Sequence, residues 1–131
     1  MDLAERGAGF AEFWQERHIP TLTTVRPDGT PHVVPVGATL DLETGTALVI
    51  TSGASRKARL IAAAGEEGLP VAICQVDGRR WSTLEGRAVV LDSPEAVAEA
   101  ERRYASRYKP PRANPVRVVL EIRVTRVLGN V

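Results

Sequence analysis

The sequence ITSGASRKARL at residues 50–60 places three cations, Arg56, Lys57 and Arg59, directly after a β-like apolar stretch and a turn of small residues. The alanines and leucine beyond predict a helix over residues 55–64, so these cations crowd its start. Because a helix N-terminus already carries about half a positive charge, like charges there are disfavoured by about 0.3–1 kcal/mol each. Free main-chain N–H groups at the same end, with nearby hydroxyls, favour a bound phosphate. A solvated basic turn whose side chains reach acidic residues elsewhere explains the pattern equally well.

Two other stretches have the composition of a binding site. In PHVVPVG, Pro35 removes a hydrogen-bond donor from a strand and Gly37 removes a side chain two residues later. This is typical of an edge strand, a bulge or a place where a flat molecule approaches the main chain. In QVDGRRW, Gln75, Arg80 and Trp81 flank a tight turn, and taken alone they are a solvated turn and a core tryptophan. Together with the basic helix start, the three stretches suit a phosphorylated planar heterocycle.

No familiar catalytic set is present, and we assign no catalytic residue. The two histidines, His18 and His32, have no cysteine or carboxylate at metal-ligand spacing, so we expect no metal site. A nucleophile elbow, a P-loop and a paired-carboxylate pattern are also missing. If the protein is an enzyme, a bound cofactor is expected to carry the chemistry while the protein orients it.

The elements that position these residues are mostly strands. Turn signals at 27–29 and 43–45 separate three β-branched segments between residues 21 and 51, which predicts a three-stranded antiparallel meander. A second hairpin is predicted over residues 69–92. The alternation of apolar residues over 116–124 predicts a long, half-buried strand.

Helices are few and short. Phe10, Phe13 and Trp14 lie at helical spacing in the N-terminal segment, which two glycines weaken. Ser93 followed by Pro94 is a strong helix start, and this helix ends at the proline-rich sequence that follows. About six strands with two or three helices predict a mainly β (α+β) fold, a closed or nearly closed antiparallel barrel.

Composition narrows the class of protein. A chain of 131 residues suits a single domain, 1–131, and 17 basic against 16 acidic residues argue against a general nucleic-acid binder. Cys74 is the one cysteine, so no intramolecular disulfide can form. There is no apolar run near 18 residues and no signal-peptide pattern, so we expect a cytoplasmic protein without a membrane partner.

Four stretches resemble the pyridoxamine 5′-phosphate oxidase-like family of flavin-binding split β-barrels, and more narrowly its actinobacterial branch that uses the deazaflavin coenzyme F-420. They are LTTVRPDGTPHVVPVG, ITSGASRKARL, QVDGRRWSTLEGRAVV and RYKPPRANPVRVVLEI, and the resemblance covers nearly the whole chain. It implies a six-stranded antiparallel split barrel that forms a homodimer with two cofactor sites at the interface.

The resemblance also implies an activity and a set of site residues. We expect an oxidoreductase that transfers a hydride from reduced F-420 to a conjugated acceptor, biliverdin being reduced to bilirubin. The alternatives are a non-catalytic module that binds a cofactor or tetrapyrrole, and an FMN-dependent oxidase or reductase. The cofactor-binding residues implied by position are Ser55, Arg56 and Lys57 at the phosphate, Pro35, Val36 and Gly37 at the ring, Thr51 and Ser52 at its edge or ribityl chain, and Gln75, Arg80 and Trp81 from the neighbouring subunit.

The sequence RYASRYKPPRANPVR offers candidate substrate ligands around a proline-rich turn, namely Arg103, Arg107, Lys109, Arg112 and Arg117. Arg107 and Arg112 are expected to bind carboxylates of the acceptor, because arginine suits bidentate contacts with carboxylates. Tyr104 or Tyr108 offers a ring to pack on a flat pyrrole system. The same cations alternatively attract the glutamate tail of F-420, or form the solvated face of a helix.

Overall fold

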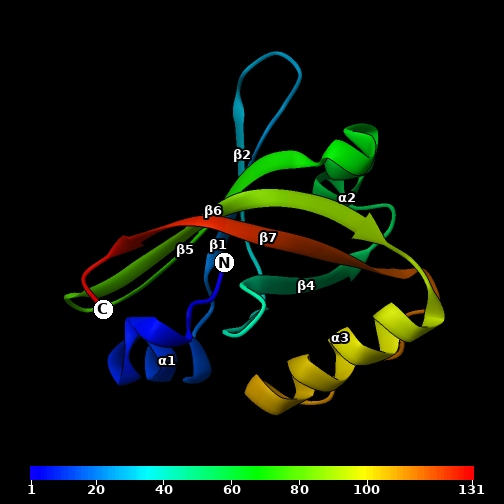
Figure 1. The fold of residues 1–131 in the computed structure, drawn as a ribbon. Helices are drawn as coiled ribbons and strands as arrows, with labels where there is room; N and C mark the ends of the chain where they lie inside the picture. The colour runs from blue at the N-terminus through cyan, green and yellow to red at the C-terminus, as the bar shows by residue number, and fades with distance from the viewer.

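The computed structural model describes all residues, 1–131, and is dominated by one antiparallel sheet that curls on itself (Figure 1). Three α-helices and two short 3-10 helices connect its seven strands. In chain order the elements are η1 (Ala4–Arg6), α1 (Ala8–Gln15), β1 (Thr21–Val25), β2 (Pro31–Pro35), β3 (Ala38–Asp41), β4 (Thr46–Ser52), α2 (Arg56–Ala63), η2 (Gly65–Glu67), β5 (Leu69–Asp77), β6 (Arg80–Leu91), α3 (Pro94–Arg107) and β7 (Arg117–Gly129).

The strand order in the sheet is β2-β1-β5-β6-β7-β4-β3. The strands β2 and β3 follow each other in the chain, yet they lie at opposite ends of this order, joined only by Val36 and Gly37. The expected three-stranded meander is therefore wrong: β1 pairs with β2, and β3 pairs with β4, as two separate hairpins.

The break between β2 and β3 has a local cause. Pro35 has no N–H with which to continue the ladder. The N–H of Val36 donates to the carbonyl of Pro20, outside any strand pairing, at 2.9 Å. One expected strand thereby becomes two, so the sheet has seven strands instead of six, while the mainly β, antiparallel fold with three helices is confirmed.

The helices begin where the sequence predicts. Ser55 caps α2 by accepting a hydrogen bond from the N–H of Ala58 at 3.2 Å, and Ser93 caps α3 in the same way with Pro94 at its first position. Such caps stabilise a helix by about 1 kcal/mol. The N-terminal helix is broken at Gly7, whose φ of 97° ends η1 before α1 starts.

The core lies inside the curled sheet. Leu22, Ile73, Leu84, Leu120 and Ile122 come from four different strands and are all fully buried. The alternation predicted for the C-terminal strand is confirmed from Val118 to Val124, whose alternate apolar residues face this core, whereas Val116 precedes β7 and is exposed. Helix α3 packs against β3, β4 and β7, and α2 packs against β6 and β1 (Figure 1).

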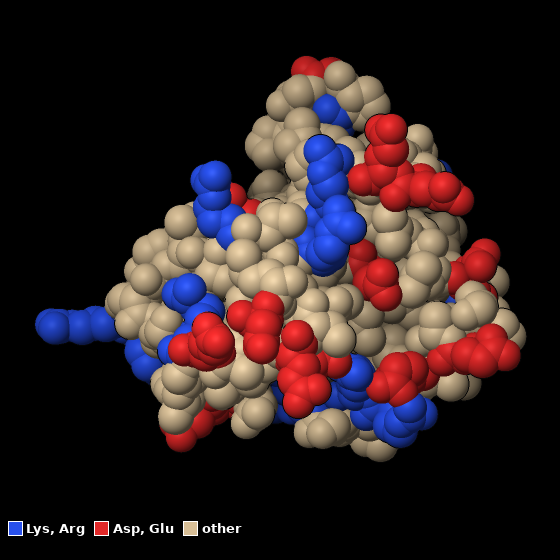
Figure 2. Space-filling model, viewed as in Figure 1, with Lys and Arg blue, Asp and Glu red and all other residues tan.

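Basic and acidic side chains are interspersed on the face of the molecule that Figure 2 shows, in keeping with the net charge of +1. None of the helices has both the length and the apolar character that crossing a membrane requires.

Candidate functional site

A cleft of about 440 Å³ lies where the break between β2 and β3 meets the start of α2 and the end of α3. Of the residues expected at the site, six line this cleft: Pro35, Val36, Gly37, Thr51, Lys57 and Arg112. The fold thus brings together residues that lie up to 77 positions apart in the chain, from 35 to 112. Four cations line the cleft, whereas no aspartate or glutamate does.

Lys57 provides the uncompensated charge at the helix end of the cleft. It is half-buried and has no carboxylate partner, and loss of contact with water lowers the pKa of its ammonium group below the usual value. Arg56 and Arg59 are exposed and make no ion pair either. The three cations at the start of α2 are therefore not explained by acidic residues of the same chain.

The hydroxyl groups beside Lys57 organise the start of the helix. Thr51 donates from Oγ1 to Oγ of Ser55 at 3.2 Å, while Ser55 caps α2. The carbonyl of Ser52 accepts from the N–H of Ser55 at 3.0 Å, which closes the turn. Of these three residues, only Thr51 lines the cleft itself.

Gly37 makes room for aromatic rings of the same chain. A Cβ at this position would lie 2.6 Å from Cε2 of Tyr104 and 3.2 Å from Cε2 of Tyr108. The absence of a side chain, expected to serve a flat ligand, is thus needed for the packing of α3. Tyr104 in turn lines the cleft, so the glycine lets an aromatic ring form part of its wall.

The peptide of Ala38, next to this glycine, is held from two sides. Tyr108 accepts from the N–H of Ala38 at 3.1 Å and donates to the carbonyl of His18 at 2.7 Å. Nη1 of Arg107 donates to the carbonyl of Ala38 at 2.6 Å. Burial raises the pKa of Tyr108, so its hydroxyl remains protonated and able to donate.

Arg107 and Gln75 belong to an internal network instead of the cleft. Arg107 is 9% exposed, and it donates to the carbonyl of Glu16 at 2.8 Å and to Oε1 of Gln75 at 2.9 Å. Gln75 is 2% exposed and donates to the carbonyl of Phe13 at 2.8 Å. Burial lowers the pKa of the Arg107 guanidinium.

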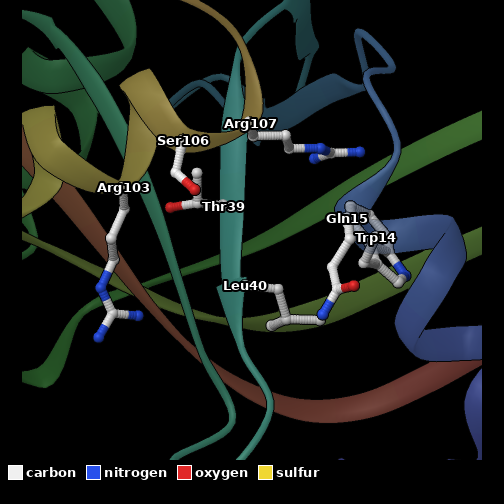
Figure 3. Close-up of a pocket in the computed structure, with 7 residues that line it drawn as sticks. All are labelled: Trp14, Gln15, Thr39, Leu40, Arg103, Ser106 and Arg107. Atoms are coloured by element: carbon white, nitrogen blue, oxygen red, sulfur yellow. The ribbon is translucent and has the colours of Figure 1, made fainter.

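Arg107 and Arg112, both expected to bind the acceptor, line different pockets. Arg107 lines a second pocket of about 360 Å³ between α1, β3 and α3, together with Trp14 and Thr39. Figure 3 shows its guanidinium extending towards Trp14 and Gln15 and away from Arg103. Arg107 therefore ties α1, β3 and β5 together, whereas Arg112 lines the cleft.

Arg80 and Trp81 lie on the β5–β6 hairpin, outside the cleft of their own chain. Arg80 forms ion pairs with Glu16 at 3.0 Å and Asp77 at 2.6 Å, and its hydrogen bond holds the pKa of the Glu16 carboxyl below the usual value. His18 lies against Glu16 in the same cluster. Trp81 is 40% exposed.

Sequence reasoning did not place two residues that shape the cleft, Ile50 and Asn114, and it offered Arg117 only as one of several candidate cations. The side chain of Arg117 is 9% exposed, donates to Glu101 at 2.6 Å and to the carbonyl of Arg112 at 2.7 Å. It therefore braces the loop that carries Arg112. The sequence signal for this role was an arginine at the start of the last strand, directly after a proline-rich turn.

Comparison with known proteins gives a consistent assignment. The profile of the family described as pyridoxamine 5′-phosphate oxidase matches residues 8–130. An F-420H(2)-dependent biliverdin reductase of Mycobacterium tuberculosis is 53% identical over 118 residues, which cover 90% of this chain and 83% of that protein.

Two solved structures share the fold. One, described as an F-420 reductase, has a TM-score of 0.73 and 23% identity over 93% of this chain and 98% of its own. A conserved hypothetical protein of Mycobacterium tuberculosis has a TM-score of 0.77 and 24% identity over 98% of this chain and 84% of its own. The family profile spans almost the entire sequence, so the chain belongs to the pyridoxamine 5′-phosphate oxidase family.

Proposed function

We propose that this protein is an oxidoreductase that uses reduced coenzyme F-420 to reduce biliverdin. The observation that carries the proposal is the cleft, in which four cations and no carboxylate line a space bounded by the β2–β3 break and Tyr104. The 53% identity to an F-420H(2)-dependent biliverdin reductase supports the same activity. The relative is matched over 83% of its length, so the likeness extends over most of both proteins.

The residues present fit an acidic, planar coenzyme. Lys57 offers a positive charge without an acidic partner, beside the N-terminus of α2, where a phosphate is favoured. We assign the phosphate to Ser55, Arg56 and Lys57, and the ring to the main chain at 35–37, with Thr51 and Ser52 along its edge. When bound, the reduced coenzyme supplies a hydride, and the residues around it hold it in place and exclude water.

The activity is tested by mixing the purified protein with reduced F-420 and following the absorbance of the oxidised coenzyme after biliverdin is added. We expect oxidation that requires both protein and biliverdin. FMN in its reduced form, tested in the same way, serves as the comparison for cofactor choice. Tight binding of F-420 without oxidation on addition of biliverdin would contradict the proposal and indicate a binding module.

Replacing Lys57 tests the phosphate assignment. A hydrogen bond to a charged group contributes about 1.5–3 kcal/mol, so Lys57→Ala is expected to weaken F-420 binding by about tenfold to a hundredfold. The measurement is a fluorescence titration of the coenzyme. Arg59→Ala is the matched control, because Arg59 is an exposed cation on the same helix that does not line the cleft. Equal affinities of Lys57→Ala and Arg59→Ala would remove the assignment.

A homodimer and a cytoplasmic location are also part of this proposal. Val76 and Trp81 are register partners on one face of the β5–β6 hairpin, 68% and 40% exposed. Thr83 lies on that same face and pairs with Leu128, which is 40% exposed. Such a patch suits a second copy of the chain, which would bring Arg80 and Trp81 towards the partner's cleft.

A further inference from the structure

The loop between α3 and β7 carries two cations that no residue of the chain neutralises. Lys109 and Arg112 are both exposed and both line the cleft, and neither side chain makes an ion pair or a hydrogen bond. The nearest braced cation, Arg117, has its own carboxylate in Glu101. Two separate positive charges are therefore available at this end of the cleft.

The loop that presents these cations is held in a defined position. Arg117 fixes the carbonyl of Arg112 at 2.7 Å. Val116 accepts from the N–H of Gly53 at 2.9 Å, which ties the loop to the turn before α2. Side-chain Oδ1 of Asn114 accepts from the N–H of Val116 at 3.0 Å. These bonds hold the main chain of residues 112–117 beside the cleft, and the exposed side chains of Lys109 and Arg112 extend from this end of it.

An aromatic ring lines the cleft between this loop and the β2–β3 break. Tyr104 packs close to Gly37, and its ring centroid is 4.9 Å from that of Tyr108 at an interplanar angle of 36°. Tyr108 is fixed by its bonds to the main chain of Ala38 and His18. The Tyr104 ring is therefore held in place by Tyr108, and its face is suited to packing against a planar molecule.

We propose that this end of the cleft is the acceptor subsite, in which Tyr104 packs against a planar conjugated molecule and Lys109 and Arg112 bind its carboxylates. The proposal rests on the function proposed above. Two spaced cations suit a molecule with two separate carboxylates better than they suit one phosphate, for which Lys57 and the start of α2 are available. The glutamate tail of F-420 also carries carboxylates that these cations could bind. The experiment below distinguishes carboxylates of the acceptor from those of the coenzyme tail.

The test compares biliverdin with its dimethyl ester, in which both carboxylates are blocked. We expect Lys109→Ala/Arg112→Ala to raise the KM for biliverdin tenfold or more with little change in kcat, and to leave the KM for the ester unchanged. The affinity for F-420 should stay within twofold in a fluorescence titration. Arg59→Ala/Arg123→Ala is the matched control, since it removes two exposed cations outside the cleft.

The aromatic part is tested with two variants of Tyr104. Tyr104→Leu is expected to raise the KM for biliverdin and for the ester alike, and Tyr104→Phe to restore both values. Circular dichroism checks that each variant is folded.

Three results would overturn the proposal: a KM for biliverdin that the double variant leaves unchanged, an equal effect on acid and ester, or a loss of F-420 affinity that grows with the number of glutamates. The last result would assign the loop to the coenzyme tail. Direct binding of biliverdin and its ester, followed by tryptophan fluorescence, gives a readout without turnover. If wild-type protein binds biliverdin with the expected preference over the ester but does not reduce it, the proposed activity fails while the subsite stands.

Discussion

His32 is a half-buried histidine in a positively charged setting. Its Nδ1 has no hydrogen-bond partner, and neither has Oγ1 of Thr24, its register partner across β1 and β2. Loss of contact with water, together with the charges of Arg26, Lys57 and Arg56, lowers the pKa of the ring. His32 is consequently neutral at pH 7 in the folded protein.

This lowered pKa predicts a dependence of stability on pH. Below about pH 6.5 the unfolded chain protonates the ring, whereas the folded chain does so only at a lower pH, so the free energy of unfolding falls as the pH falls through this window. Urea unfolding at pH 7.5 and pH 5.5 measures the change. The drop is expected to be smaller for His32→Gln than for the wild type, and an equal drop would show that His32 does not contribute.

At the level of single residues, an exposed cation without an acidic partner is easier to predict from the sequence than a buried one. Lys57 lines the cleft, and its place at the start of a helix is a local feature that the sequence shows. The burial of Arg107, predicted to be a substrate ligand, depends on carbonyl groups of Glu16 and Ala38, 91 and 69 positions away. No local pattern reveals such acceptors.

At the level of elements, the close contact between Gly37 and α3 leads to a prediction. A Cβ at Gly37 would stand 2.6 Å from the Tyr104 ring, so Gly37→Ala is expected to push the ring aside and to destabilise the protein by about 1–3 kcal/mol. Urea unfolding measures this cost. In a Tyr104→Leu background the same change should cost less, because the clashing ring is gone. Additive effects would show that the ring does not limit this position.

The elements themselves were largely predictable, but their partners were not. Helices α2 and α3 begin at Ser55 and Ser93 because capping is encoded within three residues. The hairpin of β5 and β6 followed from a tight turn between two apolar runs. The prediction of a three-stranded meander was wrong because the chain changes strand partner between Pro35 and Gly37. The sequence alone does not show that β2 pairs with β1 and β3 with β4.

At the level of the whole molecule, the exposed face of the β5–β6 hairpin predicts self-association. Trp81→Glu is expected to shift the protein from dimer to monomer in sedimentation experiments at micromolar concentration, since it places a charge in an apolar interface. Ala62→Glu, an exposed substitution on α2, is the control. A wild-type protein that sediments as a monomer would contradict the shared site, as would a Trp81→Glu variant that remains dimeric.

The strand β7 joins two parts of the sheet that have no other pairing with each other. It lies between β6 and β4, and without it β3 and β4 form a hairpin apart from β2, β1, β5 and β6. A chain that has emerged from the ribosome only as far as residue 116 therefore lacks the strand pairing that joins the two pieces of sheet. The cleft needs both pieces, because β2 and β4 each contribute to it. The proposed coenzyme site is thus complete only after β7 has been synthesised, and until then the nascent chain carries unpaired strand edges that other chains can join.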